Sequence, residues 1–124
     1  MAMTVFFEDS FNAAHRLPHV LATHKCYKLH GHTYHVRIEV AGDVQPDGFI
    51  VDYEEIRKAW RPLFALLDHQ TLNLVEGLSN PTCEVLAMWI GTALRREPPR
   101  LDVVMVEVRE TVSCGATMRW DRRR

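Results

Sequence analysis

An α+β domain, with a four-stranded antiparallel sheet and two helices on one of its faces, is the fold class that the sequence predicts. The chain has 124 residues, which is the usual size of one domain, so we expect a single domain over residues 1–124. Two strand-like segments come first, two helix-like segments follow, and two more strand-like segments end the chain. Two hairpins connected by a pair of helices form such a sheet.

Residues 3–15 are predicted to form the first strand. Their apolar side chains share one parity, and His15 stands at the far end of this row. Asp9 interrupts the row and is interpreted as a bulge or a sheet edge. Residues 17–29 contain Pro18 and no sustained period, so they are predicted to form a loop.

Residues 30–41 are predicted to form the second strand, which begins with a pair of histidines. Side chains two residues apart on a strand project from the same face, so His30 and His32 lie side by side, with Gly31 between them. The same face continues as an apolar stripe of Tyr34, Val36, Ile38 and Val40. The two histidines therefore end a core-facing row, as His15 does on the first strand.

Two helices are predicted in the middle of the chain. Asp52 is a suitable N-cap for the first, and one helical face carries its apolar side chains, namely Ile56, Trp60, Leu63 and Leu67. Pro62 lies within this pattern and is expected to kink the helix or split it. The second helix is predicted to start at Asn80-Pro81. Its predicted buried stripe consists of Val85, Trp89 and Ala93.

The remaining segments complete the sheet. Residues 42–48 are rich in turn-forming side chains, and residues 49–51 are predicted to form a short strand. The last two strands are predicted over residues 101–110 and 112–120. Such a sheet has two free, apolar edges, so oligomerisation by edge pairing is expected.

The composition indicates neither a nucleic-acid nor a membrane partner. The formal net charge is -1. No apolar run approaches roughly 18 residues, and no basic segment followed by an apolar one opens the chain. The three cysteines, an odd number, fit reduced thiols better than a disulfide framework. We therefore expect a cytoplasmic protein.

The densest chemical motif lies at the start of the second strand. Cys26 precedes His30 and His32 by a few residues, and thiolate and imidazole are both ligands that Zn²⁺ prefers. A lone His-x-His motif is a weak signal. The nearby cysteine strengthens it, and so does His15 at the end of the neighbouring row. The sequence therefore indicates a zinc site at this end of the sheet.

These motifs resemble the 6-pyruvoyl tetrahydropterin synthase family, and within it the bacterial 6-carboxy-5,6,7,8-tetrahydropterin synthase branch of queuosine biosynthesis. The matching segments extend over nearly the whole chain: residues 11–17, 26–32, 67–69, 72–73, 80–84 and 108–111. The spacing Cys-x-x-x-His-Gly-His is the most specific of them. Its short gap favours the carboxy-forming branch over the pyruvoyl-forming one.

The resemblance implies a fold and an assembly. The fold is the tunnelling fold (T-fold), in which ββααββ units oligomerise into a β-barrel. A homo-oligomer is therefore expected, either a hexamer or a tetramer, with active sites between subunits.

The resemblance also implies a metal centre. His15, His30 and His32 would bind Zn²⁺ and leave one position open, as catalytic zinc sites do. Zinc bound to the hydroxyl oxygens of the substrate would acidify the adjacent C–H bonds, and Cys26, as thiolate, would be the general base. The alternative is that Cys26 closes the site as a fourth ligand, which would make the zinc structural.

Three further roles come from the resemblance. Asp68 would orient His69, which would assist Cys26 and shuttle protons; alternatively, the pair only marks the C-terminus of a helix. Glu110 would anchor the pterin through its 2-amino-4-oxo edge and take part in proton transfer, unless it forms an ion pair with an arginine. Thr82 would contact the pterin or be an ordinary first-turn helix residue. Relatives commonly carry Ser or Thr at the position of Cys83.

The predicted function is that of a zinc-dependent lyase. It would convert 7,8-dihydroneopterin triphosphate to 6-carboxy-5,6,7,8-tetrahydropterin, acetaldehyde and triphosphate. One alternative is 6-pyruvoyl tetrahydropterin synthase activity, which uses the same site and retains the three-carbon side chain. The other is a non-catalytic, zinc-stabilised oligomeric binding module, which would unfold when zinc is removed.

Overall fold

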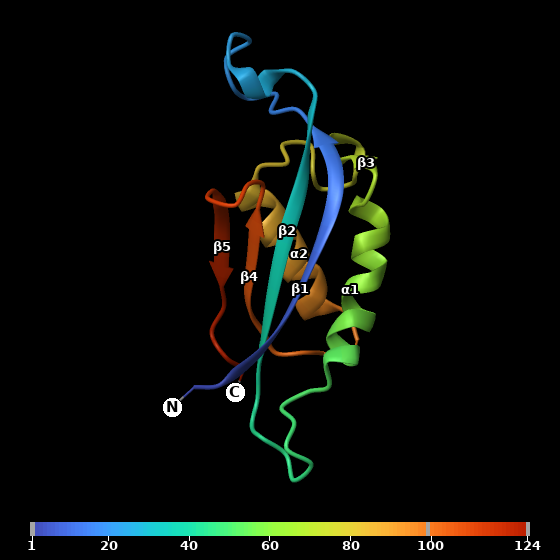
Figure 1. The fold of residues 1–124 in the computed structure, drawn as a ribbon, viewed down its shortest axis with the longest axis vertical. Helices are drawn as coiled ribbons and strands as arrows, with labels where there is room; N and C mark the ends of the chain where they lie inside the picture. The colour runs from blue at the N-terminus through green and yellow to red at the C-terminus, as the bar shows by residue number, and fades with distance from the viewer. Residues whose placement is uncertain (1, 99, 124) are drawn as a thin grey trace.

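The computed structural model describes residues 2–98 and 100–123, and it has the predicted α+β class. The strands form one sheet in the order β3-β1-β2-β4-β5, and both helices lie on the same side of it (Figure 1). No helix in these two ranges is long and apolar enough to cross a membrane. The elements are β1 (Thr4–His15), η1 (Lys25–Tyr27), β2 (His30–Ala41), α1 (Tyr53–Leu67), β3 (Gln70–Thr71), η2 (Leu72–Leu74), α2 (Cys83–Arg96), β4 (Val103–Arg109) and β5 (Gly115–Arg119).

The sheet has five strands, so the predicted count of four is wrong. The additional strand, β3, has two residues and pairs in parallel with Ala13 and Ala14 of β1, whereas all other pairs are antiparallel. A strand of two residues has no alternation that a sequence could display. The short strand predicted over residues 49–51 is absent. A turn precedes this segment, in which the Gln45 N–H donates to the Phe49 carbonyl at 2.8 Å.

β1 and β2 pair over their whole length, from Thr4 opposite Ala41 to His15 opposite His30. The register has no break at Asp9, so this residue marks no bulge. β1 is a sheet edge at Asp9, because β3 pairs only with Ala13 and Ala14 near the end of β1. The Asp9 carboxylate accepts a hydrogen bond from the Trp60 indole of α1 at 2.9 Å. The one charged residue of the apolar row therefore has a hydrogen-bond donor.

The core lies between the sheet and the two helices. The apolar stripe of β2 is buried as predicted, and Tyr34 at its start is 0% exposed. α1 is a single helix despite Pro62, so the predicted split is wrong. Pro62 is on the exposed side of α1, where the carbonyl that loses its N–H partner can bind water.

α2 begins at Cys83, later than predicted, because Thr82 is its N-cap and accepts a hydrogen bond from the Val85 N–H at 3.1 Å. The predicted buried stripe, which contains Trp89, is only partly buried. The buried side of α2 lies one position further along the chain and ends at Leu94.

Gly91 of α2 is the point where the C-terminal segment packs against the helix. A Cβ added there would overlap the Trp120 ring. We expect Gly91→Ala to lower the free energy of unfolding by about 1–3 kcal/mol, through overpacking. This loss exceeds the gain of up to about 1 kcal/mol that alanine brings to a helix. Urea denaturation measures the difference, with Thr92→Ala at the next, exposed position as the control. A Gly91→Ala protein as stable as the wild type would contradict this packing.

Candidate metal centre and substrate site

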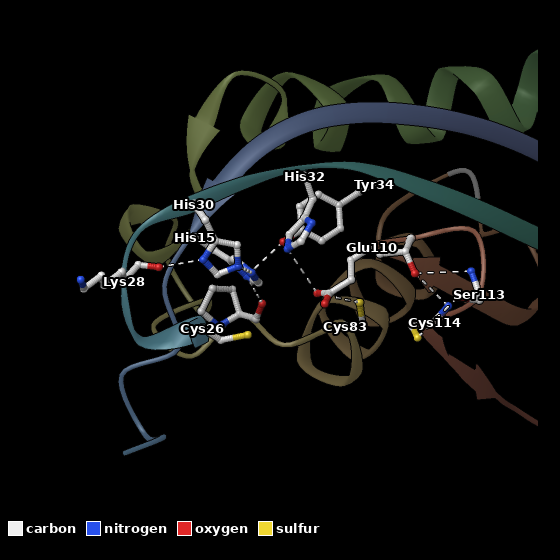
Figure 2. Close-up of polar contacts among 12 residues, drawn as sticks. His15, Cys26, Lys28, His30, His32, Tyr34, Cys83, Glu110, Ser113 and Cys114 are labelled. Atoms are coloured by element: carbon white, nitrogen blue, oxygen red, sulfur yellow. Dashed lines mark hydrogen bonds and ion pairs between the residues drawn. The ribbon is translucent and has the colours of Figure 1, made fainter. Parts of the chain in front are cut away.

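His15, His30 and His32 converge at one end of the helix-covered face of the sheet (Figure 2). One ring nitrogen of each lies within 4.8 Å of the others. The Nε2 atoms of His15 and His30 are 3.1 Å apart. The β1–β2 register produces this cluster, because it places His15 opposite His30 and Ala13 opposite His32.

Backbone carbonyls lie beside the outer nitrogens of two of these rings. His15 Nδ1 lies 3.0 Å from the Pro81 carbonyl oxygen, and His30 Nδ1 lies 2.7 Å from that of Lys28. A carbonyl only accepts, so a proton on each Nδ1 leaves both Nε2 lone pairs facing the common centre. This orientation is the one that metal-binding histidines adopt.

His32 provides the observation that most favours a metal ion. Its Nε2 is buried and has no hydrogen-bond partner among residues 2–98 and 100–123. A buried nitrogen without a partner costs free energy, and coordination would remove that cost. Burial also lowers the pKa of His15, which keeps this ring in its neutral, metal-binding form.

The donor set fits zinc with an open coordination position. Three imidazoles are a known ligand set of catalytic zinc. The Cys26 thiol does not belong to the group of clustered ligand atoms, within the part of the chain that the structure describes. The arrangement therefore differs from a closed structural site, for which Cys26 would have to be the fourth ligand.

Cys26 lies in η1, on the loop that joins β1 to β2, and its thiol is half-buried. The Cys26 N–H donates to His24 Nδ1 at 3.0 Å, and the Leu17 N–H donates to the Cys26 carbonyl at 2.8 Å. Two residues further on, Lys28 contacts His30 through its carbonyl. The loop that carries the thiol thus borders the histidine cluster.

Glu110 faces the cluster from the end of β4 (Figure 2). Its Oε2 lies 3.9 Å from His32 Nε2 and 3.8 Å from Cys83 Sγ. No arginine or lysine forms an ion pair with Glu110 in the described ranges, and Arg109 pairs with Glu107 instead at 2.7 Å. The alternative, an ion pair between Glu110 and an arginine, is therefore not present among the described residues of one chain.

Cys83 and Thr82, at the start of α2, belong to the same end of the molecule. Burial, reinforced by the Glu110 carboxylate, raises the pKa of the Cys83 thiol to about 12, so it stays protonated and can donate to that carboxylate. Sequence reasoning gave Cys83 no role because relatives commonly carry Ser or Thr there, which put a hydroxyl contact at this position in doubt. Thr82 is the N-cap of α2, which is close to the alternative of an ordinary first-turn helix residue. Its hydroxyl oxygen accepts the capping hydrogen bond, so its hydroxyl hydrogen remains free to donate.

Tyr34 is a second residue that sequence reasoning placed only in the core stripe. Its ring stacks on Phe11 with 5.0 Å between centroids, and its hydroxyl lies 3.0 Å from His15 Nδ1. Burial raises its pKa, with a further contribution from the charge of Glu110, so the hydroxyl keeps its proton. An alternation pattern shows that Tyr34 is buried but does not show where its hydroxyl points.

Asp68 and His69 lie apart from the histidine cluster. Asp68 Oδ2 is 2.7 Å from His69 Nδ1, and Asp68 Oδ1 accepts from the Asn12 N–H at 3.0 Å. The hydrogen bond from Asn12, followed by the one from His69, lowers the pKa of Asp68. The His69 side chain is 77% exposed and lines a hollow with Asn12 and Thr33, which His32 also borders. Asn12 and Thr33 have the opposite parity to His15, and His69 is not among the clustered ligand atoms, so His69 lies on the Asn12–Thr33 side of the sheet.

Sequence similarity links the chain to one family of enzymes. The sequence model of the family "6-pyruvoyl tetrahydropterin synthase" matches residues 4–121. The 6-carboxy-5,6,7,8-tetrahydropterin synthase of Synechocystis sp. is 37% identical over 118 residues, which cover 90% of this chain and 89% of the relative. The dihydroneopterin monophosphate aldolase of Pyrococcus furiosus is 30% identical over 99 residues, covering 80% and 81%.

A solved structure extends the likeness to the whole fold. The 6-pyruvoyl tetrahydropterin synthase of Caenorhabditis elegans superposes with a TM-score of 0.84 at 26% identity, covering 98% of this chain and 97% of that one. The family match, the relatives and the shared fold cover nearly the same residues. The chain therefore belongs to the 6-pyruvoyl tetrahydropterin synthase family of enzymes.

Proposed function

We propose that this protein is a zinc-dependent lyase of queuosine biosynthesis. It converts 7,8-dihydroneopterin triphosphate to 6-carboxy-5,6,7,8-tetrahydropterin, acetaldehyde and triphosphate. The observation that carries the proposal is the cluster of three imidazoles, in which the unpaired Nε2 of His32 faces Glu110. The names of relatives in Synechocystis sp. and Bacillus subtilis, 37% and 36% identical, support the carboxy-pterin product.

The metal and the pterin would be held by separate groups. His15, His30 and His32 hold Zn²⁺, which when bound supplies the Lewis acidity that makes the substrate's hydroxyls and neighbouring C–H bonds more acidic. Glu110 accepts the two parallel N–H groups of the pterin edge, in the way a carboxylate accepts a guanidinium. Because Glu110 lies beside His32, the pterin side chain is directed toward the metal centre.

Cys26, as thiolate, removes a proton from the substrate's side chain, and His69, oriented by Asp68, exchanges protons with it. In one chain His69 lies on the Asn12–Thr33 side of the sheet, apart from the clustered ring nitrogens. We therefore propose that a second copy supplies His69 and that the active site lies between subunits of a hexamer or tetramer. The free edges of β3 and β5 offer unpaired backbone groups through which such sheets can join.

The experiment that tests this function is product analysis by mass spectrometry. Zinc-loaded wild type and Cys26→Ala are incubated with 7,8-dihydroneopterin triphosphate and, separately, with the monophosphate. Carboxy-pterin and acetaldehyde from wild type alone would support the proposal. A pyruvoyl-pterin would indicate the sister reaction, and cleavage of the monophosphate alone would indicate the activity for which the Pyrococcus relative is named. If the zinc-loaded protein leaves both substrates unchanged, the result would favour the non-catalytic binding module over the enzyme.

Cys83 gives a prediction about substrate binding. Cys83→Ala removes the donor that holds the Glu110 carboxylate, whereas Cys83→Ser keeps a donor at that position. We expect the alanine variant to bind a non-reactive pterin such as neopterin about fivefold more weakly, since the typical net contribution of one hydrogen bond is about 1 kcal/mol. Fluorescence quenching gives the two dissociation constants, and zinc content serves as the control. Equal affinities for both variants would show that the thiol does not position Glu110.

A further inference from the structure

His15 has two neighbours at the same ring nitrogen. Nδ1 lies 3.0 Å from the Pro81 carbonyl oxygen and 3.0 Å from the Tyr34 hydroxyl oxygen. The carbonyl can only accept a hydrogen bond, whereas the hydroxyl can donate or accept. A neutral imidazole carries one N–H, on either nitrogen. Nδ1 of His15 therefore finds a partner whether or not it carries the proton.

With the proton on Nδ1, His15 donates to Pro81 and turns its Nε2 lone pair toward His30. His30 Nε2 also presents a lone pair, because its Nδ1–H donates to the Lys28 carbonyl at 2.7 Å. Two lone pairs only 3.1 Å apart repel each other unless a cation lies near both. This tautomer of His15 therefore belongs to the metal-bound protein.

With the proton on Nε2, the same atoms form a continuous chain of hydrogen bonds. The Tyr34 hydroxyl donates to His15 Nδ1, His15 Nε2–H donates to His30 Nε2, and His30 Nδ1–H donates to the Lys28 carbonyl. Every donor in this chain is paired without a cation, while the Pro81 carbonyl loses its donor and faces the Nδ1 lone pair. This arrangement has two hydrogen bonds to His15, whereas the Nδ1–H tautomer has one to Pro81 and sets two Nε2 lone pairs against each other. No heavy atom has to move between the two arrangements, and the stacking of Tyr34 on Phe11 fixes the hydroxyl in place.

We propose that Tyr34 is a positioning residue that holds His15 as its Nε2–H tautomer in the metal-free protein. Coordination of a metal ion by Nε2 would release the Nε2 proton to water, and Nδ1 would take up a proton from water, so the ring would keep one proton and no net charge. Pro81 accepts that Nδ1–H, and the Tyr34 hydroxyl stops donating to His15. Tyr34 thus stabilises the empty site and opposes metal binding. This inference rests on the metal centre of the proposed function but not on its reaction.

The test is the zinc affinity of Tyr34→Phe, which keeps the stacked ring and removes only the hydroxyl. Competition with a chromophoric chelator is expected to show zinc bound about fivefold more tightly, since one hydrogen bond no longer has to be broken. The thermal midpoint should fall more in the metal-free form than in the zinc-loaded form. Tyr53→Phe, at an exposed tyrosine of α1, is the matched control and should leave both quantities unchanged.

Wild-type protein gives a second measurement that needs no variant. Long-range ¹H–¹⁵N NMR spectra should show His15 as the Nε2–H tautomer without zinc and as the Nδ1–H tautomer with zinc. An Nδ1–H tautomer in the metal-free protein would overturn the proposal, and so would an unchanged or weaker zinc affinity of Tyr34→Phe. Failure of the wild type to bind zinc would overturn the metal centre itself. Failure of turnover by a zinc-loaded protein would affect only the proposed reaction.

Discussion

Cys26→Ala is expected to lower kcat/KM for 7,8-dihydroneopterin triphosphate by about a thousandfold, the usual size of a general base's contribution. The zinc content should stay at the wild-type level, because the three histidines cluster without the thiol. The folded structure should also persist, since the Cys26 side chain is only half-buried and its loop is held by backbone contacts. Rates of carboxy-pterin formation and zinc stoichiometry, measured on the same samples, check both expectations.

The matched control for this variant is Cys114→Ala. Cys114 lies in the exposed β4–β5 connection, and its thiol is close only to the Ser113 hydroxyl among described residues. Removing it should leave turnover and zinc content unchanged. If Cys26→Ala instead loses zinc and unfolds, Cys26 is a fourth ligand. That result would contradict its role as base and favour the non-catalytic binding module.

The metal centre could be predicted because strand alternation determines which side chains share a face. His15 ends the core-facing row of the first strand, and His30 and His32 together end that of the second, which could be inferred from the sequence. Glu110 could be placed in the same way, from its parity with Val108. The antiparallel register then brought the ends of these two rows into one cluster, with His15 directly opposite His30.

Features without a period could not be predicted. β3 is too short to alternate, and the start of α2 was assigned to a proline although the hydroxyl of Thr82 caps the helix. Parity also gave no face for His69, which has a left-handed backbone (φ 58°) just outside a strand. The direction of a polar group could not be predicted either. The alternation pattern showed that Tyr34 is buried, but it did not show that the Tyr34 hydroxyl contacts His15.

Restoration of activity by mixing two inactive variants is the second large effect that we expect. In one chain His69 lies on the Asn12–Thr33 side of the sheet, apart from the cluster, so the proposed site takes Cys26 from one chain and His69 from another. Cys26→Ala and His69→Ala should each be nearly inactive alone. When the two are unfolded, mixed in equal amounts and refolded with zinc, about a quarter of the sites should combine both wild-type residues, given random assembly of a symmetric oligomer.

Activity near a quarter of the wild-type value is therefore the expected result, measured as carboxy-pterin formation per zinc. Wild type refolded alone is the control for recovery by refolding, each variant refolded alone gives the background activity, and the two mixed without unfolding are the control for subunit exchange. The double variant Cys26→Ala/His69→Ala, refolded with either single variant, should stay inactive, because no pairing then contains both groups. A co-refolded mixture as inactive as its parents would show that Cys26 and His69 act within one chain. Such a site would require β3 and the preceding turn to move around the edge of β1, against the hydrogen bonds that hold Asp68 and His69 to Asn12.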